Sequence, residues 1–271
     1  DDRKALAIAI NQNLSCLLLG ETGTGKTSIV KELAFLRKQP YVRVNMTGFT
    51  TPDELIGSKS VKDGHTYFEH GIITDAMQRG AMLVIDEINA TTPDCLFILH
   101  GLLDEDRRIT LPNGETITPH ENFRVFATCN PDYEGTKSMN KAFIDRFPII
   151  LFIDTLAPKA EQKLLVDRTD IGKDLAEQLV VIGTMARKDY VENKLSVFIS
   201  TRGLLSVANL IKNDLSPRKA YETAIVQKTS NKDEQKILLD FFLSVFKMAQ
   251  GTEDNYIVVQ QSEITALKHR I

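Results

Sequence analysis

One octapeptide, residues 20–27, constrains this chain more strongly than any other stretch, because it fits the pattern G-x-x-x-x-G-K-[ST]. The apolar run 16–19 precedes it and the helix-forming run 28–37 follows it. Glycines let the backbone take positive φ and turn its N–H groups toward an anion, and the following helix directs its positive end at the same place. The alternative is a chance glycine-rich turn, which the flanking strand and helix disfavour. The pattern therefore predicts a phosphate-binding loop.

The residues of this loop have expected roles around a triphosphate. Lys26 is expected to reach the β- and γ-phosphates. The hydroxyl of Thr27 suits a Mg²⁺ ion shared with those phosphates, because that ion requires octahedral oxygen coordination and takes few ligands from protein. The predicted nucleotide-binding set comprises Gly20, Glu21, Thr22, Gly23, Thr24, Gly25, Lys26, Thr27 and Ser28.

A second chemical motif is a pair of carboxylates at the end of an apolar run. Residues 81–85 are wholly apolar and lead directly into Asp86 and Glu87. A buried parallel strand delivers acids in this way to the carboxyl edge of an α/β sheet. We expect Asp86 to hold Mg²⁺ through water and Glu87 to polarise the water that attacks the γ-phosphate. Such pairs are common, but a position roughly sixty residues beyond a phosphate loop makes this one specific.

The pattern of apolar and β-branched residues predicts a sheet that would bring these motifs together. Five segments read as strands: 14–19, 41–45, 81–87, 123–128 and 149–153. Asn45 ends the second of them, and Asn130 follows the fourth. An amide at Asn130 would lie at the same sheet edge as the two acids, where it can position water or the γ-phosphate.

Two hairpins are predicted outside the sheet. Residues 108–118 alternate around an Asn-Gly pair, which is the strongest short hairpin signal. Residues 65–69 predict one arm of a smaller hairpin, after a loop at 58–64. Tyr67 and Phe68 in that arm are interpreted as packing residues, the alternative being aromatics that grip a polymer. The two arginines at 107–108 lie beside acidic residues, so we expect them to form a solvated charge cluster.

Composition limits the classes of partner. The 271 residues, 42% hydrophobic and 25% charged, suit one large domain or two unequal ones, and a net charge of −3 counts mildly against nucleic acid and anionic membranes. Cys16, Cys95 and Cys129 lack metal spacing and are expected to be buried thiols. With no membrane-length apolar run and no opening signal, a cytoplasmic protein is expected. The five histidines do not cluster, so no transition-metal site is predicted.

The pattern changes to helices after residue 158. Helical periodicity covers 159–167, 175–187, 203–213 and 237–248, and Ser216-Pro217 opens another helix. Two domains are predicted, namely an α/β nucleotide-binding core over 1–155 and a helical lid with a C-terminal tail over 156–271. Arg202 stands in the first turn of one lid helix, where a positive charge opposes the helix dipole. We therefore interpret Arg202 as a ligand of an anion such as the γ-phosphate, rather than as a solvated side chain.

Taken together, residues 14–210 resemble the AAA+ ATPases, and specifically their MoxR-like and dynein-related branch. By this resemblance GETGTGKT is Walker A and LVIDEIN is Walker B. Asn130 is similar to sensor 1, and Arg202 to sensor 2. Arg146, in FIDRF, resembles the arginine finger that reaches the nucleotide of a neighbouring subunit, and Asn45 resembles the residue that restrains the Walker B glutamate.

Both hairpins belong to the same resemblance. The segment 65–71 resembles the helix-2 insert of this branch, and the Asn113-Gly114 hairpin resembles its pre-sensor-1 hairpin. The chain departs from the family pattern at Gly71-Ile72, where the family has Gly-Pro. This departure leaves the boundary of the insert open but not the assignment of the site residues.

The resemblance implies an α/β fold, namely an AAA+ P-loop sandwich with a five-stranded parallel sheet and a small all-α lid. It implies ATP and Mg²⁺ as cofactors, ATP hydrolysis, and a homo-oligomeric ring, with a hexamer as the expected state. The ring would remodel or activate a client protein together with a partner that carries a von Willebrand factor A domain. The implied catalytic residues are Glu87, Asn130, Arg146, Arg202 and Asn45, and the implied metal ligands are Thr27 and Asp86.

Two other function classes stay open from the residues alone. Related clades use the same hairpins on DNA, so a nucleic-acid translocase of restriction type is one alternative. A slow, nucleotide-gated assembly module is the other. The stretch 231–234 superficially resembles a guanine-recognition motif, but it follows a helical region rather than a strand, so ATP is preferred over GTP.

Overall fold

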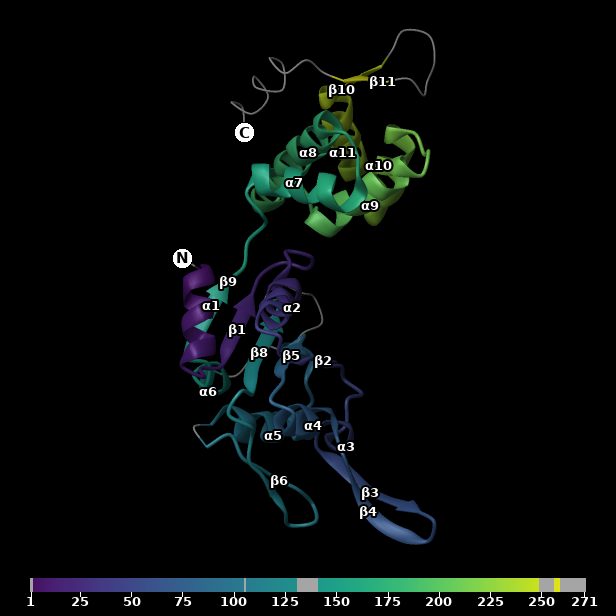
Figure 1. Ribbon diagram of the computed structural model, residues 1–271. Coiled ribbons are helices and arrows are strands. Elements are labelled where there is room, and N and C mark those ends of the chain that lie inside the picture. The colour runs from purple at the N-terminus through teal and green to yellow at the C-terminus, as the bar shows by residue number, and fades with distance from the viewer. Residues whose placement is uncertain (1, 105, 131–140, 249–255, 259–271) are drawn as a thin grey trace. The chain divides into compact units, whose positions relative to one another are not determined.

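The computed structural model describes residues 2–104, 106–130, 141–248 and 256–258 (Figure 1). The chain divides into two compact units. The first covers residues 1–21 and 25–153, and the second covers residues 154–271 together with the loop tip at 22–24. In the part of the chain that the structure describes, no helix is both long and apolar enough to cross a bilayer.

The first unit is built on one parallel sheet. Its strands are β1 (Cys16–Leu19), β2 (Tyr41–Asn45), β5 (Met82–Asp86), β8 (Arg124–Cys129) and β9 (Ile149–Phe152), in the order β2-β5-β8-β1-β9. Every neighbouring pair in this sheet is parallel. The predicted five-stranded parallel sheet is therefore confirmed. Parallel strands end at a common edge, so the segments that follow them meet there.

Helices cover both faces of this sheet, which explains why its strands are apolar on both sides. On one face α1 (Asp2–Asn11) and α2 (Lys26–Leu36) pack against Leu18, Val84 and Phe126. The other face carries α3 (Pro52–Ile56), α4 (Ile72–Gln78) and α5 (Pro93–Leu103).

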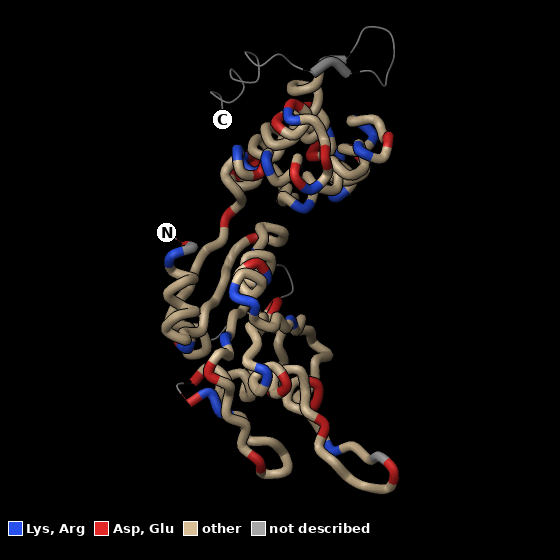
Figure 2. The backbone as a smooth tube through the Cα atoms, in the orientation of Figure 1, with Lys and Arg blue, Asp and Glu red and all other residues tan. Residues whose placement is uncertain are grey.

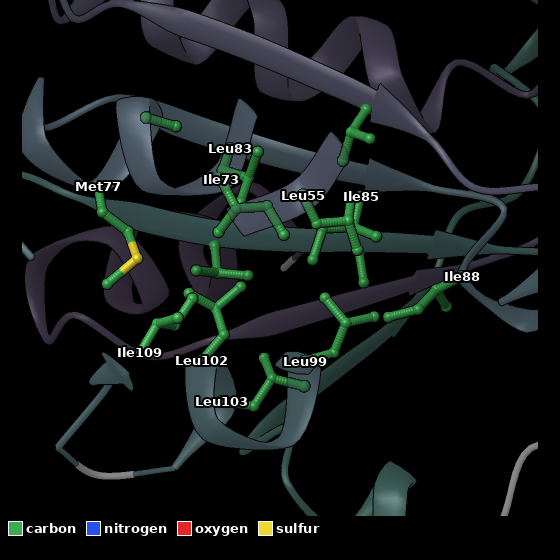
Figure 3. Close-up of a cluster of buried hydrophobic side chains, with 14 of the residues drawn as sticks. Leu55, Ile73, Met77, Leu83, Ile85, Ile88, Leu99, Leu102, Leu103 and Ile109 are labelled. Atoms are coloured by element: carbon green, nitrogen blue, oxygen red, sulfur yellow. The ribbon is translucent and has the colours of Figure 1, made fainter. Parts of the chain in front are cut away.

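Figure 3 shows the centre of the hydrophobic cluster between this second face of the sheet and its helices. Leu83 and Ile85 of β5 lie among Leu55 of α3, Ile73 of α4 and Leu99 of α5, and all five side chains are fully buried. Successive side chains of a strand point to opposite faces, so the alternate residues of β5 face the helices on the other side. Asp86, next in the strand after Ile85, therefore faces the side of α2.

The segment at 57–62 corrects the sequence prediction. Instead of a loop, it is the strand β3 (Gly57–Lys62), paired antiparallel with β4 (His65–His70). Asp63 and Gly64 between them both have positive φ, 51° and 77°, as a two-residue hairpin turn requires. The arm was missed because most of its residues are exposed or half-buried, so it carries no alternation of apolar and polar residues.

The second predicted hairpin is confirmed. It consists of β6 (Ile109–Thr110) and β7 (Thr116–Ile117). Its turn contains Pro112, Asn113 and Gly114, because the N–H of Gly114 donates to the carbonyl of Leu111 at 2.9 Å and Gly114 has φ 86°.

Arg107, just before this hairpin, is not part of a solvated cluster. Its side chain is buried and donates to Asn13 Oδ1 at 2.7 Å and to Ser15 Oγ at 3.0 Å. Burial lowers the pKa of Arg107 to about 10. The prediction was wrong for this residue because its partners come from the segment that leads into β1, more than 90 positions earlier in the chain. Arg108 is exposed, as predicted.

The second unit is helical, which confirms the predicted fold of the C-terminal region. Its helices are α7 (Pro158–Thr169), α8 (Lys173–Val191), α9 (Thr201–Lys212), α10 (Pro217–Ala224) and α11 (Lys232–Val245). The predicted helix at 237–248 ends early, because residues 246–248 form β10 (Phe246–Met248), paired with β11 (Tyr256–Val258). Phe246 stacks on Phe242 with ring centroids 4.4 Å apart, so extended backbone keeps this ring in the core.

Candidate functional site

The glycine-rich loop between β1 and α2 curls around the Lys26 ammonium group. Gly20 and Gly25 have positive φ, 143° and 97°, which glycine adopts without strain. Lys26 is buried, and its Nζ donates to the carbonyl oxygens of Gly20 at 2.7 Å and Glu21 at 2.9 Å. A cation and a helix N-terminus therefore lie together, which is the arrangement that attracts a phosphate.

The two carboxylates after β5 have different environments. Asp86 is buried, at 7% exposure, whereas Glu87 is exposed. Glu87 has a left-handed backbone, φ 55° and ψ 46°, and this reversal separates the two side chains. A buried acid suits the binding of an ion, and an exposed acid beside it suits the orientation of water.

One hydroxyl of the neighbouring strand contacts the carboxylate of Asp86 and the backbone of Glu87. Thr128 Oγ1 donates a hydrogen bond to Asp86 Oδ1. The same oxygen accepts a hydrogen bond from the backbone N–H of Glu87 at 3.3 Å. Thr128 is itself 1% exposed, so water does not replace these contacts readily.

Arg43 of β2 is the second partner of Asp86. Its Nε donates to Asp86 Oδ2 at 2.9 Å, and its Nη2 forms an ion pair with the same oxygen. Sequence reasoning missed both Arg43 and Thr128. The sequence did contain a signal for Arg43. It is a charged residue inside a β-branched strand, two positions before Asn45 at the strand end. Alternation placed it on the same side as that asparagine.

The asparagines lie at the same edge of the sheet as the acids. Asn45 is in register with Asp86 across β2 and β5 and is exposed. No side-chain hydrogen bond joins Asn45 to Glu87 in the described chain, so a restraining role for Asn45 stays a prediction. Asn130 follows β8, and its carbonyl oxygen accepts a hydrogen bond from Asn89 Nδ2 at 3.1 Å. The carboxyl ends of β2, β5 and β8 thus carry the predicted polar groups side by side.

Two of these residues could hold a magnesium ion. Thr27 stands in the first turn of α2 and offers a hydroxyl oxygen, and Asp86 offers a carboxylate. No group of three or more His, Cys, Asp or Glu residues gathers as a metal site among the described residues. Mg²⁺ bound with phosphates needs only one or two protein oxygens, so this donor set fits that ion.

Arg146 lies away from this edge of its own chain. It precedes β9, whose first residue, Ile149, is in register with Cys16, the first residue of β1. Arg146 is therefore near the amino ends of the strands, whereas Asp86 lies at the carboxyl ends. Its Nε donates to Asp104 Oδ1 at 3.1 Å. Burial and then the charge of Arg146 lower the pKa of the nearby His100.

Arg202 belongs to the second unit, at the start of α9. The preceding Ser200 caps this helix by accepting from the N–H of Gly203 at 3.2 Å. Thr201 Oγ1 donates to Glu161 Oε1 at 2.6 Å, and the buried Glu161 also accepts two hydrogen bonds from Arg187 at 2.7 and 2.8 Å. The helix start that carries Arg202 is thus firmly held within this unit.

The sequence matches two protein families. Residues 15–147 match the AAA domain of the dynein-related subfamily. Residues 161–242 match the CbbQ/NirQ/NorQ C-terminal family. The first match contains the loop, the acid pair and Arg146, and the second contains Arg202.

Individual relatives extend over most of the chain. An uncharacterized protein of Staphylococcus aureus (strain NCTC 8325 / PS 47) is 33% identical over 253 residues, which cover 88% of this chain and 92% of that protein. The aerobic cobaltochelatase subunit CobS of Sinorhizobium sp is 29% identical over 222 residues, which cover 75% of this chain and 67% of CobS.

A solved structure shares the fold. The crystal structure of a proposed ATPase from Cytophaga hutchinsonii ATCC 33406 matches 100% of this chain and 88% of its own, at 18% identity and a TM-score of 0.51. The sequence matches and the parallel sheet with its glycine-rich loop agree with one another. The chain therefore belongs to the MoxR-like branch of the AAA+ ATPases, with a dynein-related AAA domain followed by a CbbQ/NirQ/NorQ C-terminal region.

Proposed function

We propose that this chain binds ATP with Mg²⁺, hydrolyses it, and works as one subunit of a homo-oligomeric ring that remodels or activates a client protein. The observation that carries the proposal is the shared edge of the sheet. There, the loop around Lys26 follows β1, and a buried acid, Asp86, and an exposed acid, Glu87, lie at the end of β5, one strand further than the neighbouring β8. We propose residues 1–155 as the nucleotide-binding core and residues 156–271 as the lid with the tail.

Each residue at this edge has a role that its environment supports. Lys26 would bind the phosphates, and Thr27 and Asp86 would hold Mg²⁺, which neutralises phosphate charge when bound. Glu87 is exposed and can orient a water molecule for attack. Asn130 would position the γ-phosphate. Beyond these five, Arg202 would bind the same phosphate as sensor 2, and Asn45 would restrain Glu87 as in the family pattern.

The position of Arg146 supports a ring. Within its own chain this residue is near the amino ends of the strands, so it does not complete the chain's own site. The guanidinium of Arg146 would instead reach the nucleotide of a neighbouring subunit, where its charge would stabilise the phosphate that is being transferred. We propose a hexamer, in keeping with the family resemblance.

The hairpins offer a surface for a protein rather than for a nucleic acid. Val61 on the β3–β4 hairpin is 73% exposed. Acidic positions lie at both hairpin turns (Figure 2). They are Asp63 and Glu115, and both are exposed. Negative charge at the turns opposes contact with a phosphate backbone. These features favour a client or partner protein over DNA.

A separate partner protein is part of the proposal. The relative CobS is, by its name, one subunit of a larger chelatase. The MoxR-like resemblance points to a partner with a von Willebrand factor A domain. The three cysteines are buried and form no disulfide, which supports a reducing, cytoplasmic location.

The test is the steady-state ATPase rate, measured at physiological salt with added DNA, RNA or a copurifying partner protein. The proposal expects stimulation by the protein partner and little effect of either nucleic acid. Strong stimulation by nucleic acid, with none by any copurifying protein, would establish the translocase instead. A slow rate that no added macromolecule raises would establish the nucleotide-gated assembly module.

A further inference from the structure

The ion pair between Arg43 and Asp86 occupies the carboxylate that the proposed function assigns to magnesium. Asp86 Oδ2 accepts from Arg43, and Asp86 Oδ1 accepts from Thr128. Both oxygens of the buried carboxylate are therefore engaged by donors of the protein. Arg43 is the charged one of the two donors, and it comes from the strand next to β5.

The two members of the pair differ in their freedom to move. The side chain of Asp86 is 10% exposed, whereas that of Arg43 is 50% exposed. Arg43 belongs to β2, which is the edge strand of the sheet, so among the described residues one flank of this strand has no neighbouring strand. Thr128 donates to the other carboxylate oxygen, so Asp86 has a partner that does not depend on Arg43. The guanidinium is thus the member that can leave the carboxylate.

The guanidinium of Arg43, paired with the Asp86 carboxylate, opposes the binding of a divalent cation to the same carboxylate. Two positive charges a few ångströms apart repel each other, and burial strengthens that repulsion because the local dielectric is low. Arginine cannot lose its proton at physiological pH, so the repulsion ends only if the side chain moves. Even if Arg43 kept one hydrogen bond, its charge would weaken the attraction of Asp86 for a metal ion.

We propose that Arg43 is a positioning residue that competes with magnesium for Asp86 and thereby sets the Mg²⁺ concentration at which the nucleotide binds tightly. Without nucleotide, Arg43 neutralises the buried carboxylate. When the magnesium nucleotide arrives, the guanidinium gives way to the ion. This inference rests on the proposed function, because it assumes that the nucleotide binds at this edge of the sheet.

The test compares the wild-type chain with Arg43→Gln, which keeps a hydrogen-bond donor and removes the charge. Binding of a fluorescent, non-hydrolysable ATP analogue is titrated against Mg²⁺, and Mn²⁺ binding is followed separately by electron paramagnetic resonance. The midpoint of the metal titration should fall by about fivefold or more in Arg43→Gln, the effect of removing one nearby charge. Binding of the analogue in EDTA should change by less than about twofold.

The matched control is Arg79→Gln. Arg79 also pairs with an aspartate, since its Nη1 donates to Asp75 Oδ2 at 2.9 Å, but this pair lies on the surface of α4. The midpoint of the Mg²⁺ titration of Arg79→Gln should equal that of the wild type. In an Asp86→Asn background, Arg43→Gln should shift the midpoint much less, because no carboxylate is left to compete for, and a purely structural effect of Arg43 would not predict this coupling.

Three results separate the outcomes. An unchanged or higher midpoint in a folded Arg43→Gln protein would overturn the inference, because Arg43 would then be neutral or supportive toward the metal. If Arg43→Gln does not fold, Arg43→Met replaces it, because methionine also removes the charge, and its midpoint should fall as expected for Arg43→Gln. Failure of the wild-type chain to bind the analogue at any Mg²⁺ concentration would instead refute the proposed function.

Discussion

The hydroxyl of Thr128 accepts a hydrogen bond from the backbone N–H of Glu87 at 3.3 Å, across two adjacent strands of the sheet. The same hydroxyl donates to Asp86. The arrangement of the acid pair thus depends on β8 as well as on β5. Any change to this hydroxyl should affect the acid that orients water more than the loop that binds phosphate.

We expect Thr128→Val to lower kcat about tenfold and to leave the nucleotide Kd nearly unchanged at saturating Mg²⁺. Valine has the shape of threonine but leaves the half-buried backbone N–H of Glu87 without its acceptor, a loss of about 1 kcal/mol. Thr128→Ser keeps the hydroxyl and is the control, with turnover close to the wild type. Steady-state ATPase assays and nucleotide titrations measure both effects. Full turnover in Thr128→Val would show that the contact is dispensable.

Lys26→Ala and Glu87→Gln should fail in different ways. Lys26→Ala removes a charge that contacts phosphate, so nucleotide affinity should fall about tenfold or more. Glu87→Gln leaves that contact intact and should keep the wild-type Kd while kcat falls about a hundredfold or more. Calorimetric titration and ATPase rates distinguish the two. Equal losses of nucleotide affinity in both variants would contradict this division of roles.

Arg146 should act on the nucleotide of the neighbouring subunit. Arg146→Ala alone should lose about a thousandfold in kcat, the usual contribution of an arginine finger. Mixing it with Lys26→Ala protein should restore part of the activity, because some interfaces then pair an intact loop with an intact arginine. Mixing it with the double variant Lys26→Ala/Arg146→Ala should restore none. If the first mixture stays inactive despite proven subunit exchange, the arginine does not act across the interface.

Glu234 should give the second unit an acid-sensitive stability. Hydrogen bonds, first from Thr229 Oγ1 at 2.6 Å and then from Ser196, hold the pKa of this carboxylate below its ordinary value of 4.5. Above pH 4.5 the stabilisation is complete. As the pH falls through the lower pKa of the folded state it is lost, because the unfolded chain takes up the proton first.

The variant Glu234→Gln should therefore lose stability at neutral pH and show a weaker dependence on pH below about 4.5. Thermal unfolding followed by circular dichroism across this range measures the effect. Asp233→Asn, one residue earlier and exposed, is the matched control and should behave like the wild type. An identical pH dependence in Glu234→Gln and the wild type would rule out this role for Glu234.

Features that depend on neighbouring residues in the chain were predictable. The strand, the glycine loop and the helix at 16–36 follow from local patterns, because positive φ at glycines and a helix start are local properties. The apolar run into Asp86 and Glu87 likewise identified β5 and the edge at which it ends. A sheet of parallel strands and a helical second unit followed from the sequence of these elements.

Contacts between distant strands were not predictable in the same way. Alternation says which face of a strand a side chain occupies, but not which strand lies beside it, and the order β2-β5-β8-β1-β9 does not follow the order along the chain. Only the folded sheet brings Arg43 and Thr128 to either side of Asp86. The burial of Arg107 has the same origin, since its partner Asn13 is distant in the chain. Local sequence sets backbone conformation, whereas these pairings arise when crossover connections bring separate strands together.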